Sequence, residues 1–216
     1  MIVGQQLEYS FGRDAALRGV DIVVPDGRSV AVVGPSGCGK STLLLCLAGI
    51  LAPQGGSVRY DDTLLSALND AERCDIRARD FGFVMQFGDL VPELTWWENI
   101  SLGLLLRHEK VDRQKLSVLV KQLDLAGLEH RFPGEVSGGE RQRAAVARAV
   151  LAEPRVVFAD EPTGALDSAN GETVMELLFE QTRNQGTSLV VVTHDESRLG
   201  RFDEVVRLRD GKVVGA

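Results

Sequence analysis

The chain of 216 residues is poor in several features that would assign it to a special class. Its three cysteines, Cys38, Cys46 and Cys74, match no metal-ligand spacing and cannot all pair, which favours a reducing compartment. The longest apolar run, residues 43–52, is about half of the ~20 residues that a membrane-spanning helix requires. No basic segment followed by an apolar run opens the sequence, so we expect no signal peptide. Any membrane role is therefore expected to depend on another chain.

An excess of positive charge is also missing. The chain has 24 Lys and Arg residues against 31 Asp and Glu residues, which gives a formal net charge of -7. Because binding to a nucleic-acid backbone requires clustered Lys and Arg, this balance argues against a protein that acts mainly on nucleic acid. We expect no nucleic-acid partner.

Short runs rich in Val and Ile recur along the chain, and longer helical patterns separate most of the later ones. This alternation is typical of a largely parallel sheet with helices on its faces, in which the most uniformly apolar strands are buried. The runs are DIVVP at 21–25, SVAVVG at 29–34, FGFVM at 81–85, RVVFAD at 155–160 and SLVVVTHD at 188–195.

Two other stretches differ from this pattern. The first 30 residues and residues 55–65 contain short strands broken by Gly, Pro and Asp, which indicates a small antiparallel region. Between about residues 90 and 152 the strand signal disappears and the pattern becomes helical. The sequence therefore predicts an α/β core with a small β region, at about 1–88 and 154–216, and an inserted helical lobe at about 89–153.

A glycine-rich loop joins the second of these apolar runs to an apolar helical pattern. Residues 34–42 read GPSGCGKST, and this strand–loop–helix context is the one in which Gly-x4-Gly-Lys-Ser binds phosphates. Inward-pointing amides, a helix N-terminus and a lysine supply the positive field. A glycine-rich turn with a chance lysine is the alternative. We assign nucleotide binding to Gly34, Pro35, Ser36, Gly37, Cys38, Gly39, Lys40, Ser41 and Thr42, with Ser41 as a ligand of Mg²⁺.

Polar residues follow three other apolar runs. Asp160 ends one run and Glu161 comes next. Asp160 is expected to hold Mg²⁺ through water, and Glu161 is expected either to take a proton from the attacking water or to orient it. His194 follows another run. Considered alone, it would be interpreted as a loop histidine whose ring nitrogens have hydrogen-bond partners. Considered together with the other strand ends, it is a candidate for contacting the γ-phosphate. Gln86 follows a third run and is a candidate for the metal or the attacking water, although an isolated Gln carries little weight. The carboxyl ends of parallel strands are where ligands gather.

Residues 137–140, Ser-Gly-Gly-Glu, match the capping-box pattern at the start of a helix. The pattern explains Ser137 and Glu140. It does not explain the pair Gly138 and Gly139, because Gly in a helix costs about 1 kcal/mol relative to Ala. Bare backbone at these positions indicates a surface that a ligand approaches closely.

In their order along the chain, these motifs resemble the ATP-binding subunits of ABC transporters. The motifs are residues 34–42, Gln86, SGGE at 137–140, VVFADEPTGALD from 156, and His194. The resemblance implies a single P-loop NTPase domain, RecA-like in its core, over residues 1–216. It also implies an ATPase that uses ATP and Mg²⁺ and assembles head to tail with a second copy around two ATP molecules. A separate transmembrane permease would hold it at the cytoplasmic face of the membrane.

The resemblance implies further roles for individual residues. Ser137, Gly138 and Gly139 would face the γ-phosphate of an ATP held by the partner copy. Phe11 would stack on adenine, with Tyr9 as a weaker candidate, and Asp167 would lie in the loop that crosses the dimer interface. The sequence departs from the family pattern at Val136 and at Glu140, which replace Leu and Gln. The Glu140 charge is expected to weaken ATP-driven closure modestly.

Within the family, DEPTGALD and QFGDLVPELTWWENI resemble the MacB-type group most. That group exports macrolides, antimicrobial peptides or haem, or releases lipoproteins, and it includes a cell-division member. The resemblance implies an exporter subunit whose substrate is chosen by the permease, with haem, a peptide and a hydrophobic small molecule as the candidates. One alternative is ATP-driven mechanotransmission without transport. Another is a soluble ABC-type ATPase of DNA maintenance, against which the acidic balance and the 51 positions from Gln86 to Ser137 argue.

Overall fold

A computed structural model describes residues 1–86 and 89–214. Residues 87–88 and 215–216, which belong to the predicted core, lie outside the described residues. The chain divides into two compact units: unit 1 comprises Met1–Arg77 and Ser188–Ala216, and unit 2 comprises Ala78–Thr187. Each unit contains part of the predicted α/β arrangement and is described by itself.

Unit 1 contains the predicted small antiparallel sheet. Its strand order is β2-β1-β4-β5. The strands are β1 (Ile2–Phe11), β2 (Asp14–Val24), β4 (Gly55–Tyr60) and β5 (Thr63–Leu64). The chain continues through η1 (Leu65–Ala67) and α2 (Asp70–Asp80), and the boundary between the units falls within α2.

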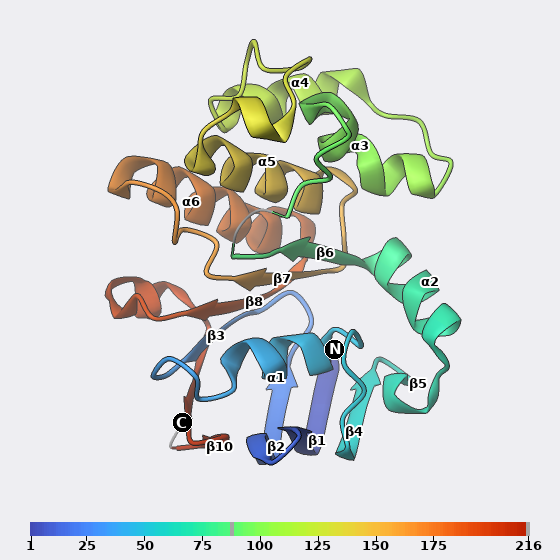
Figure 1. The fold of residues 1–216 in the computed structure, drawn as a ribbon, viewed down its shortest axis with the longest axis vertical. Coiled ribbons are helices and arrows are strands. Elements are labelled where there is room, and N and C mark those ends of the chain that lie inside the picture. The colour runs from blue at the N-terminus through green and yellow to red at the C-terminus, as the bar shows by residue number, and fades with distance from the viewer. Residues whose placement is uncertain (87–88, 215–216) are drawn as a thin grey trace. The chain divides into compact units, whose positions relative to one another are not determined.

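A second group of strands in unit 1 is parallel. β3 (Ser29–Val33) pairs in parallel with β8 (Ser188–Thr193) and with β9 (Glu204–Arg209). Every residue of β3 and β8 is buried, as expected for the most uniformly apolar runs. Helix α1 (Lys40–Leu47) contacts β1, β2 and β8, and Figure 1 shows it beside the ends of β1 and β2. A short helix, η3 (Glu196–Arg201), follows β8.

The structure contains one strand pair, at the end of unit 1, that the sequence analysis did not predict. β9 is exposed or half-buried at every position except Leu208, and β10 (Lys212–Val213) pairs antiparallel to it. The turn between them, Asp210 and Gly211, has φ values of 50° and 76°. Asp-Gly is a preferred dipeptide for a two-residue hairpin, because both positions require positive φ. This dipeptide was the signal available in the sequence.

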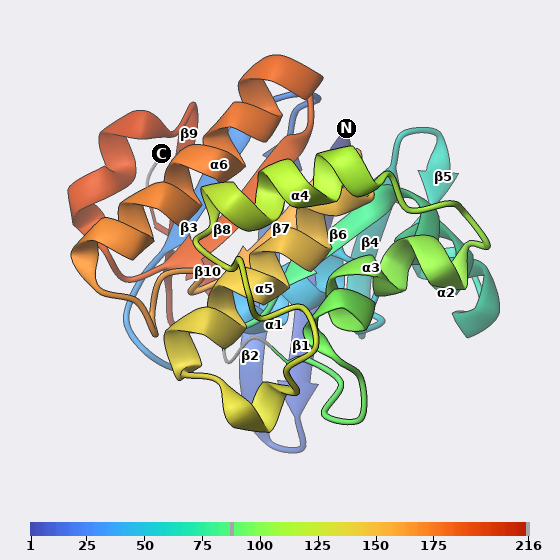
Figure 2. The same cartoon turned by 90° about the horizontal axis from the view of Figure 1, so that it is seen from above.

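Unit 2 joins a parallel strand pair to a group of helices. β6 (Phe81–Val84) pairs in parallel with β7 (Val156–Asp160). Helix α5 contacts α3, α4 and α6, and Figure 2 shows it between α3 and α6. The helices are α3 (Trp96–Leu106), α4 (Arg113–Gln122), η2 (Pro133–Glu135), α5 (Gly138–Leu151) and α6 (Ser168–Gln185).

The helical pattern of residues 89–153 thus corresponds to α3, α4, η2 and α5, without a strand in that described range. Unit 2 also includes β6, β7 and α6, so its bounds are wider than those of the predicted lobe. The single domain over residues 1–216 and the lobe boundaries stay predictions. The α/β class with a small antiparallel region is confirmed.

Candidate functional site

The glycine-rich loop lies between β3 and α1 in unit 1. Gly39 is the N-cap of α1 at φ 103°, and a Cβ there would overlap the carbonyl oxygen of Ala16. Lys40 is 9% exposed, and its Nζ donates hydrogen bonds to the carbonyl oxygens of Gly34 (2.8 Å) and Pro35 (3.0 Å). The ammonium group therefore lies against the backbone of the loop, inside the arc that a phosphate group would enter.

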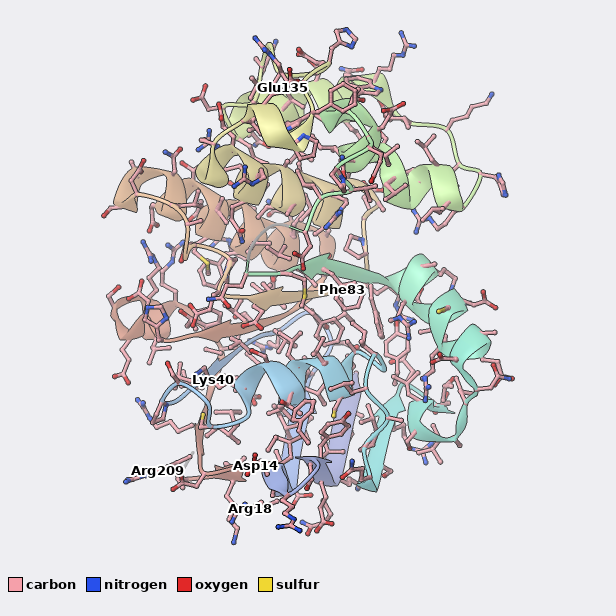
Figure 3. The ribbon with its side chains drawn as sticks, viewed as in Figure 1. Asp14, Arg18, Lys40, Phe83, Glu135 and Arg209 are labelled. Carbon is pink, nitrogen blue, oxygen red and sulfur yellow. The ribbon has the colours of Figure 1, made fainter. Side chains whose placement is uncertain are left out.

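A cavity of about 340 Å³ opens beside this loop in unit 1. Its lining combines predicted phosphate-binding residues with Phe11 and the start of β2. Figure 3 shows Lys40 at the first turn of α1 and Asp14 at the turn of the β1–β2 hairpin. The lining residues are Phe11, Asp14, Ala15, Ala16, Gly37, Gly39, Lys40, Ser41 and Thr42. The structure thus brings the predicted aromatic residue and the phosphate loop to one site.

Phe11 is well placed to present a ring to this cavity. Its side chain is 58% exposed, and its ring contacts that of Tyr9 edge to face at a centroid distance of 5.0 Å. An edge-to-face contact uses at most one face of each ring, so at least one face of Phe11 is not covered by Tyr9. Asp14 pairs with Phe11 across the hairpin and lines the same cavity, which sequence reasoning missed. The sequence did contain one indication of this role: Asp14 lies three positions after Phe11, so a tight turn between them would place the two residues opposite each other.

His194 follows β8 at the same edge as the glycine-rich loop. β3 and β8 are in register at Val33 and Thr193, so Gly34 and His194 both come directly after a paired position. His194 is exposed. Asp195 next to it caps η3, and hydrogen bonds from the Ser197 hydroxyl and amide lower the pKa of its carboxyl group.

In unit 2, the two parallel strands carry the predicted acidic residues and the glutamine. β6 and β7 are in register at Val84 and Ala159, so Asp160 ends β7 at the edge where Gln86 follows β6. Asp160 is 6% exposed and Glu161 is 9% exposed. Glu161 has φ 48°, a left-handed conformation that is uncommon for a non-glycine residue and that clusters at functional sites.

Gln142 connects helix α5 to the segment that holds Gln86. Its side chain is fully buried, and its Nε2 donates to the carbonyl oxygen of Met85 at 3.3 Å. Its Oε1 has no hydrogen-bond partner among the residues that the structure describes. Sequence reasoning missed this contact, because nothing in a helical RQR pattern indicates which polar residue turns inward.

The SGGE stretch forms the expected capping box at the start of α5. Ser137 Oγ accepts from the Glu140 amide at 3.2 Å, and the Ser137 amide and hydroxyl both donate to Glu140 Oε2 at 2.7 Å. These hydrogen bonds lower the pKa of the Glu140 carboxyl group. Ser137 and Gly138 are exposed, and a Cβ on Gly138 would meet nothing closer than Arg141 Nη2 at 3.7 Å.

The loop that contains Asp167 lies against this stretch. A Cβ on Gly139 would lie 3.3 Å from Leu166 Cδ2 and 3.5 Å from the Ala165 carbonyl oxygen. Asp167 itself is the N-cap of α6 and accepts from the Asn170 amide at 2.9 Å. The hydrogen bonds from Asn170 lower the pKa of its carboxyl group. Within unit 2, the structure therefore places Gly139 against Ala165 and Leu166, directly before Asp167.

The predicted magnesium ligands come from both units: Ser41 from unit 1, and Gln86 and Asp160 from unit 2. No group of three or more His, Cys, Asp or Glu residues suited to a metal exists within residues 1–86 and 89–214. A hydroxyl, an amide oxygen and a carboxylate are hard oxygen donors that fit Mg²⁺, which retains water and substrate phosphates as its other ligands. By donor type, each of the three residues therefore suits this ion.

No helix in the described part of the chain is long and apolar enough to cross a membrane.

A model of the ABC transporter family matches residues 17–164, which include the glycine-rich loop, the SGGE stretch and Glu161. That range is well over half of the 216 residues.

Among known proteins, the chain is similar to subunits named "Lipoprotein-releasing system ATP-binding protein LolD". It is 47% identical to that of Xanthomonas campestris pv. campestris (strain 8004) over 204 residues, covering 93% of this chain and 85% of the relative. It is 41% identical to that of Legionella pneumophila (strain Lens) over 200 residues, covering 91% of this chain and 88% of the relative.

Among solved structures, it is similar to an ATP-binding cassette captured as a dimer in a post-hydrolysis state with ADP and Pi. The TM-score is 0.92 at 34% identity, and the match covers 100% of this chain and 97% of that one. The family model, the relatives and the fold agree: this chain belongs to the ABC transporter family, as an ATP-hydrolysing nucleotide-binding subunit.

Proposed function

We propose that this subunit powers a MacB-type exporter that releases lipoproteins from a membrane. The observation that carries the proposal is the identity of 47% over 204 residues to a lipoprotein-releasing ATP-binding protein. The three substrates expected from the sequence, haem, a peptide and a hydrophobic small molecule, have no support in the names of the relatives described above. The names of the relatives likewise favour transport over mechanotransmission and over DNA maintenance.

We assign the ATP to the cavity beside the glycine-rich loop. The loop residues would bind the phosphates, Lys40 would place its ammonium group on the outer ones, and Phe11 would stack on adenine. This assignment is supported by the lining of the cavity, which joins Phe11 to Lys40, Ser41 and Thr42 in one unit. Ser41, Gln86 and Asp160 would hold Mg²⁺, which neutralises phosphate charge when bound.

The reaction itself is assigned to Glu161 and His194. The Glu161 carboxylate would accept a proton from the attacking water as a general base. Its low exposure and left-handed backbone are features of residues held in one orientation for a reaction. His194 would contact the γ-phosphate from the end of β8, at the edge that carries the glycine-rich loop.

The site would be completed by a second copy of the chain. Ser137, Gly138 and Gly139 would bind the γ-phosphate of the ATP held by the partner copy, and Asp167 would lie at the interface between the copies. The exposure of Ser137 and Gly138 and the open space beside Gly138 support this role. The dimeric state of the similar cassette supports it as well. A separate permease would bind the dimer at the cytoplasmic face of the membrane.

The proposed substrate can be tested with the chain purified together with its permease in proteoliposomes. ATP is expected to drive release of a lipidated protein from the bilayer, whereas the same protein without its acyl chains should give no ATP-dependent signal. The measurement is the fraction of lipoprotein released to an acceptor with and without ATP. Release without dependence on ATP, or ATP-dependent transport of haem or peptide with no lipoprotein release, would contradict the proposal.

A second prediction concerns the negative charge in the SGGE stretch. Because Ser137 Oγ donates to Glu140 Oε2, a phosphate oxygen that approaches must compete with a carboxylate for the same proton. Glu140→Gln removes the charge, which at a helix N-terminus is worth about 0.3–1 kcal/mol. The proposed dimer contains two such sites, so the two contributions add to about 0.6–2 kcal/mol. In a background that does not hydrolyse ATP, we therefore expect ATP-dependent dimerisation to tighten by about threefold to thirtyfold. Sedimentation at varied protein concentration measures the dissociation constant.

The chain provides a matched control for this substitution. Glu98 closes a capping box on α3 with the same hydrogen bonds, since Thr95 Oγ1 donates to Glu98 Oε2 at 2.7 Å. Glu98→Gln should cost similar helix capping and leave dimerisation unchanged. Equal dimerisation of Glu140→Gln and wild type would contradict the predicted role of the charge.

A further inference from the structure

The turn between β9 and β10 is hydrogen-bonded to the phosphate-binding loop within unit 1. The Gly211 amide donates to the carbonyl oxygen of Cys38 at 3.1 Å, and the Arg18 amide donates to the carbonyl oxygen of Gly211 at 2.8 Å. The turn therefore connects β2 to the loop through two backbone hydrogen bonds. Arg18 and Arg209, on the two strands beside this turn, are drawn pointing outward in Figure 3. Gly211 does not line the cavity itself.

This contact fixes the direction of a peptide group that faces the cavity. A trans peptide is planar, so the carbonyl of Cys38 and the amide of Gly39 point in opposite directions. Because the Cys38 carbonyl points to Gly211, the Gly39 amide points away from the turn. Gly39 lines the cavity, and its amide makes no hydrogen bond with any of the described residues. It is therefore available to an anion in the cavity.

Little free space exists around the turn. A Cβ on Gly211 would lie 2.8 Å from the Ala16 carbonyl oxygen and 3.2 Å from Arg18 Cγ. The same Ala16 oxygen is the atom that a Cβ on Gly39 would overlap. Gly211 and Gly39 thus pack against one carbonyl group of β2, whose residue Ala16 lines the cavity. Displacement of the turn would be transmitted to the loop, since close-packed backbone has no void to absorb it.

We propose that Gly211 is a positioning residue for phosphate binding: its amide holds the Cys38 carbonyl outward and so directs the Gly39 amide at the nucleotide. The proposal rests on the assignment of ATP to this cavity. It gives the β9–β10 hairpin a role in nucleotide affinity, although the hairpin touches neither the nucleotide nor the partner copy in this scheme.

The test compares Gly211→Ala with Gly186→Ala. Gly186 also has positive φ, 68°, but a Cβ there would meet nothing within 4 Å, so it carries the backbone penalty without the contact. Gly211→Ala is expected to raise the dissociation constant for Mg·ATP about tenfold. This factor corresponds to the loss of about one hydrogen bond to a charged group, here the bond from the Gly39 amide to a phosphate. The KM for ATP should rise with it while kcat stays unchanged, the signature of lost binding rather than lost chemistry. Gly186→Ala should bind as wild type does.

Hydrogen exchange of the wild-type chain provides a measurement that does not depend on the variant folding. Mg·ATP should slow exchange at the Gly211 amide as well as in residues 34–42. Unchanged exchange at Gly211, or wild-type affinity in Gly211→Ala, overturns the proposal and leaves the ATP assignment intact. If the wild-type chain itself does not bind Mg·ATP, the proposed function fails instead.

Discussion

Lys40→Ala is expected to weaken ATP binding by roughly thirtyfold or more. In the free chain the Lys40 ammonium is held by the carbonyl oxygens of Gly34 and Pro35, so the loop already positions one positive charge inside its arc. In the ATP complex, the Lys40 ammonium would pair with the negatively charged phosphates. Truncating one partner of such a buried charge pair costs about 2–5 kcal/mol of binding free energy, which corresponds to a loss of affinity of roughly thirtyfold or more. Titration of a fluorescent ATP analogue measures the dissociation constant.

Lys121→Ala is the control for this experiment. Lys121 is an exposed lysine in the last turn of α4, so its loss changes the net charge equally without touching the loop. It should bind ATP as wild type does. Thermal unfolding of Lys40→Ala checks that the two carbonyl groups left without the ammonium have not unfolded the unit. Unchanged ATP affinity in a folded Lys40→Ala would count against the assignment of the phosphates to this loop.

Glu161→Gln is expected to separate ATP binding from hydrolysis. The substitution keeps the shape of the side chain and, because neither residue is glycine, leaves the backbone preference at φ 48° nearly the same. It removes the proton acceptor, and loss of a general base lowers rates by about 10²–10⁴-fold. ATP turnover should therefore fall by that factor while ATP binding persists. Phosphate release measures the rate.

With hydrolysis stopped, the same variant should accumulate as an ATP-bound dimer. Light scattering after gel filtration detects the doubled mass. Adding Ser137→Arg to Glu161→Gln should prevent the dimer, since a bulky side chain then occupies the surface proposed to meet the ATP of the partner copy. Wild-type turnover by Glu161→Gln would show that another group activates the water, and a dimer that persists in the double variant would contradict the shared site.

The features that could be predicted from the sequence are those that depend on residues close together in the chain. The buried runs of β3, β7 and β8, the capping box at Ser137 and the glycine-rich loop each depend on neighbouring residues, and all are present. The strand β9 was not predicted, because charged residues interrupt its apolar residues and only Leu208 is buried.

Contacts between distant segments were equally hidden. Asp14 lines the cavity because the β1–β2 hairpin places it opposite Phe11, and Gln142 reaches the backbone of Met85 from a helix that begins more than 50 residues later. Gly211 contacts Cys38 from the far end of the chain. Such pairings depend on how elements pack, which no local pattern specifies. The residues assigned from family resemblance, such as Asp167, stay predictions of function even where their local structure is now known.

The capping box also determines what kind of event ATP-driven closure would be. In the free subunit the Ser137 hydroxyl and amide already donate to an anionic oxygen, that of Glu140. A phosphate arriving on the partner copy would not fill an empty position; it would replace one anion by another. Such an exchange has a small net energy, because the bonds formed resemble the bonds broken. In the free subunit, Glu140 therefore occupies the Ser137 donors until a more highly charged phosphate group replaces it. The dimer could then form and dissociate repeatedly with only a small change in hydrogen-bond energy.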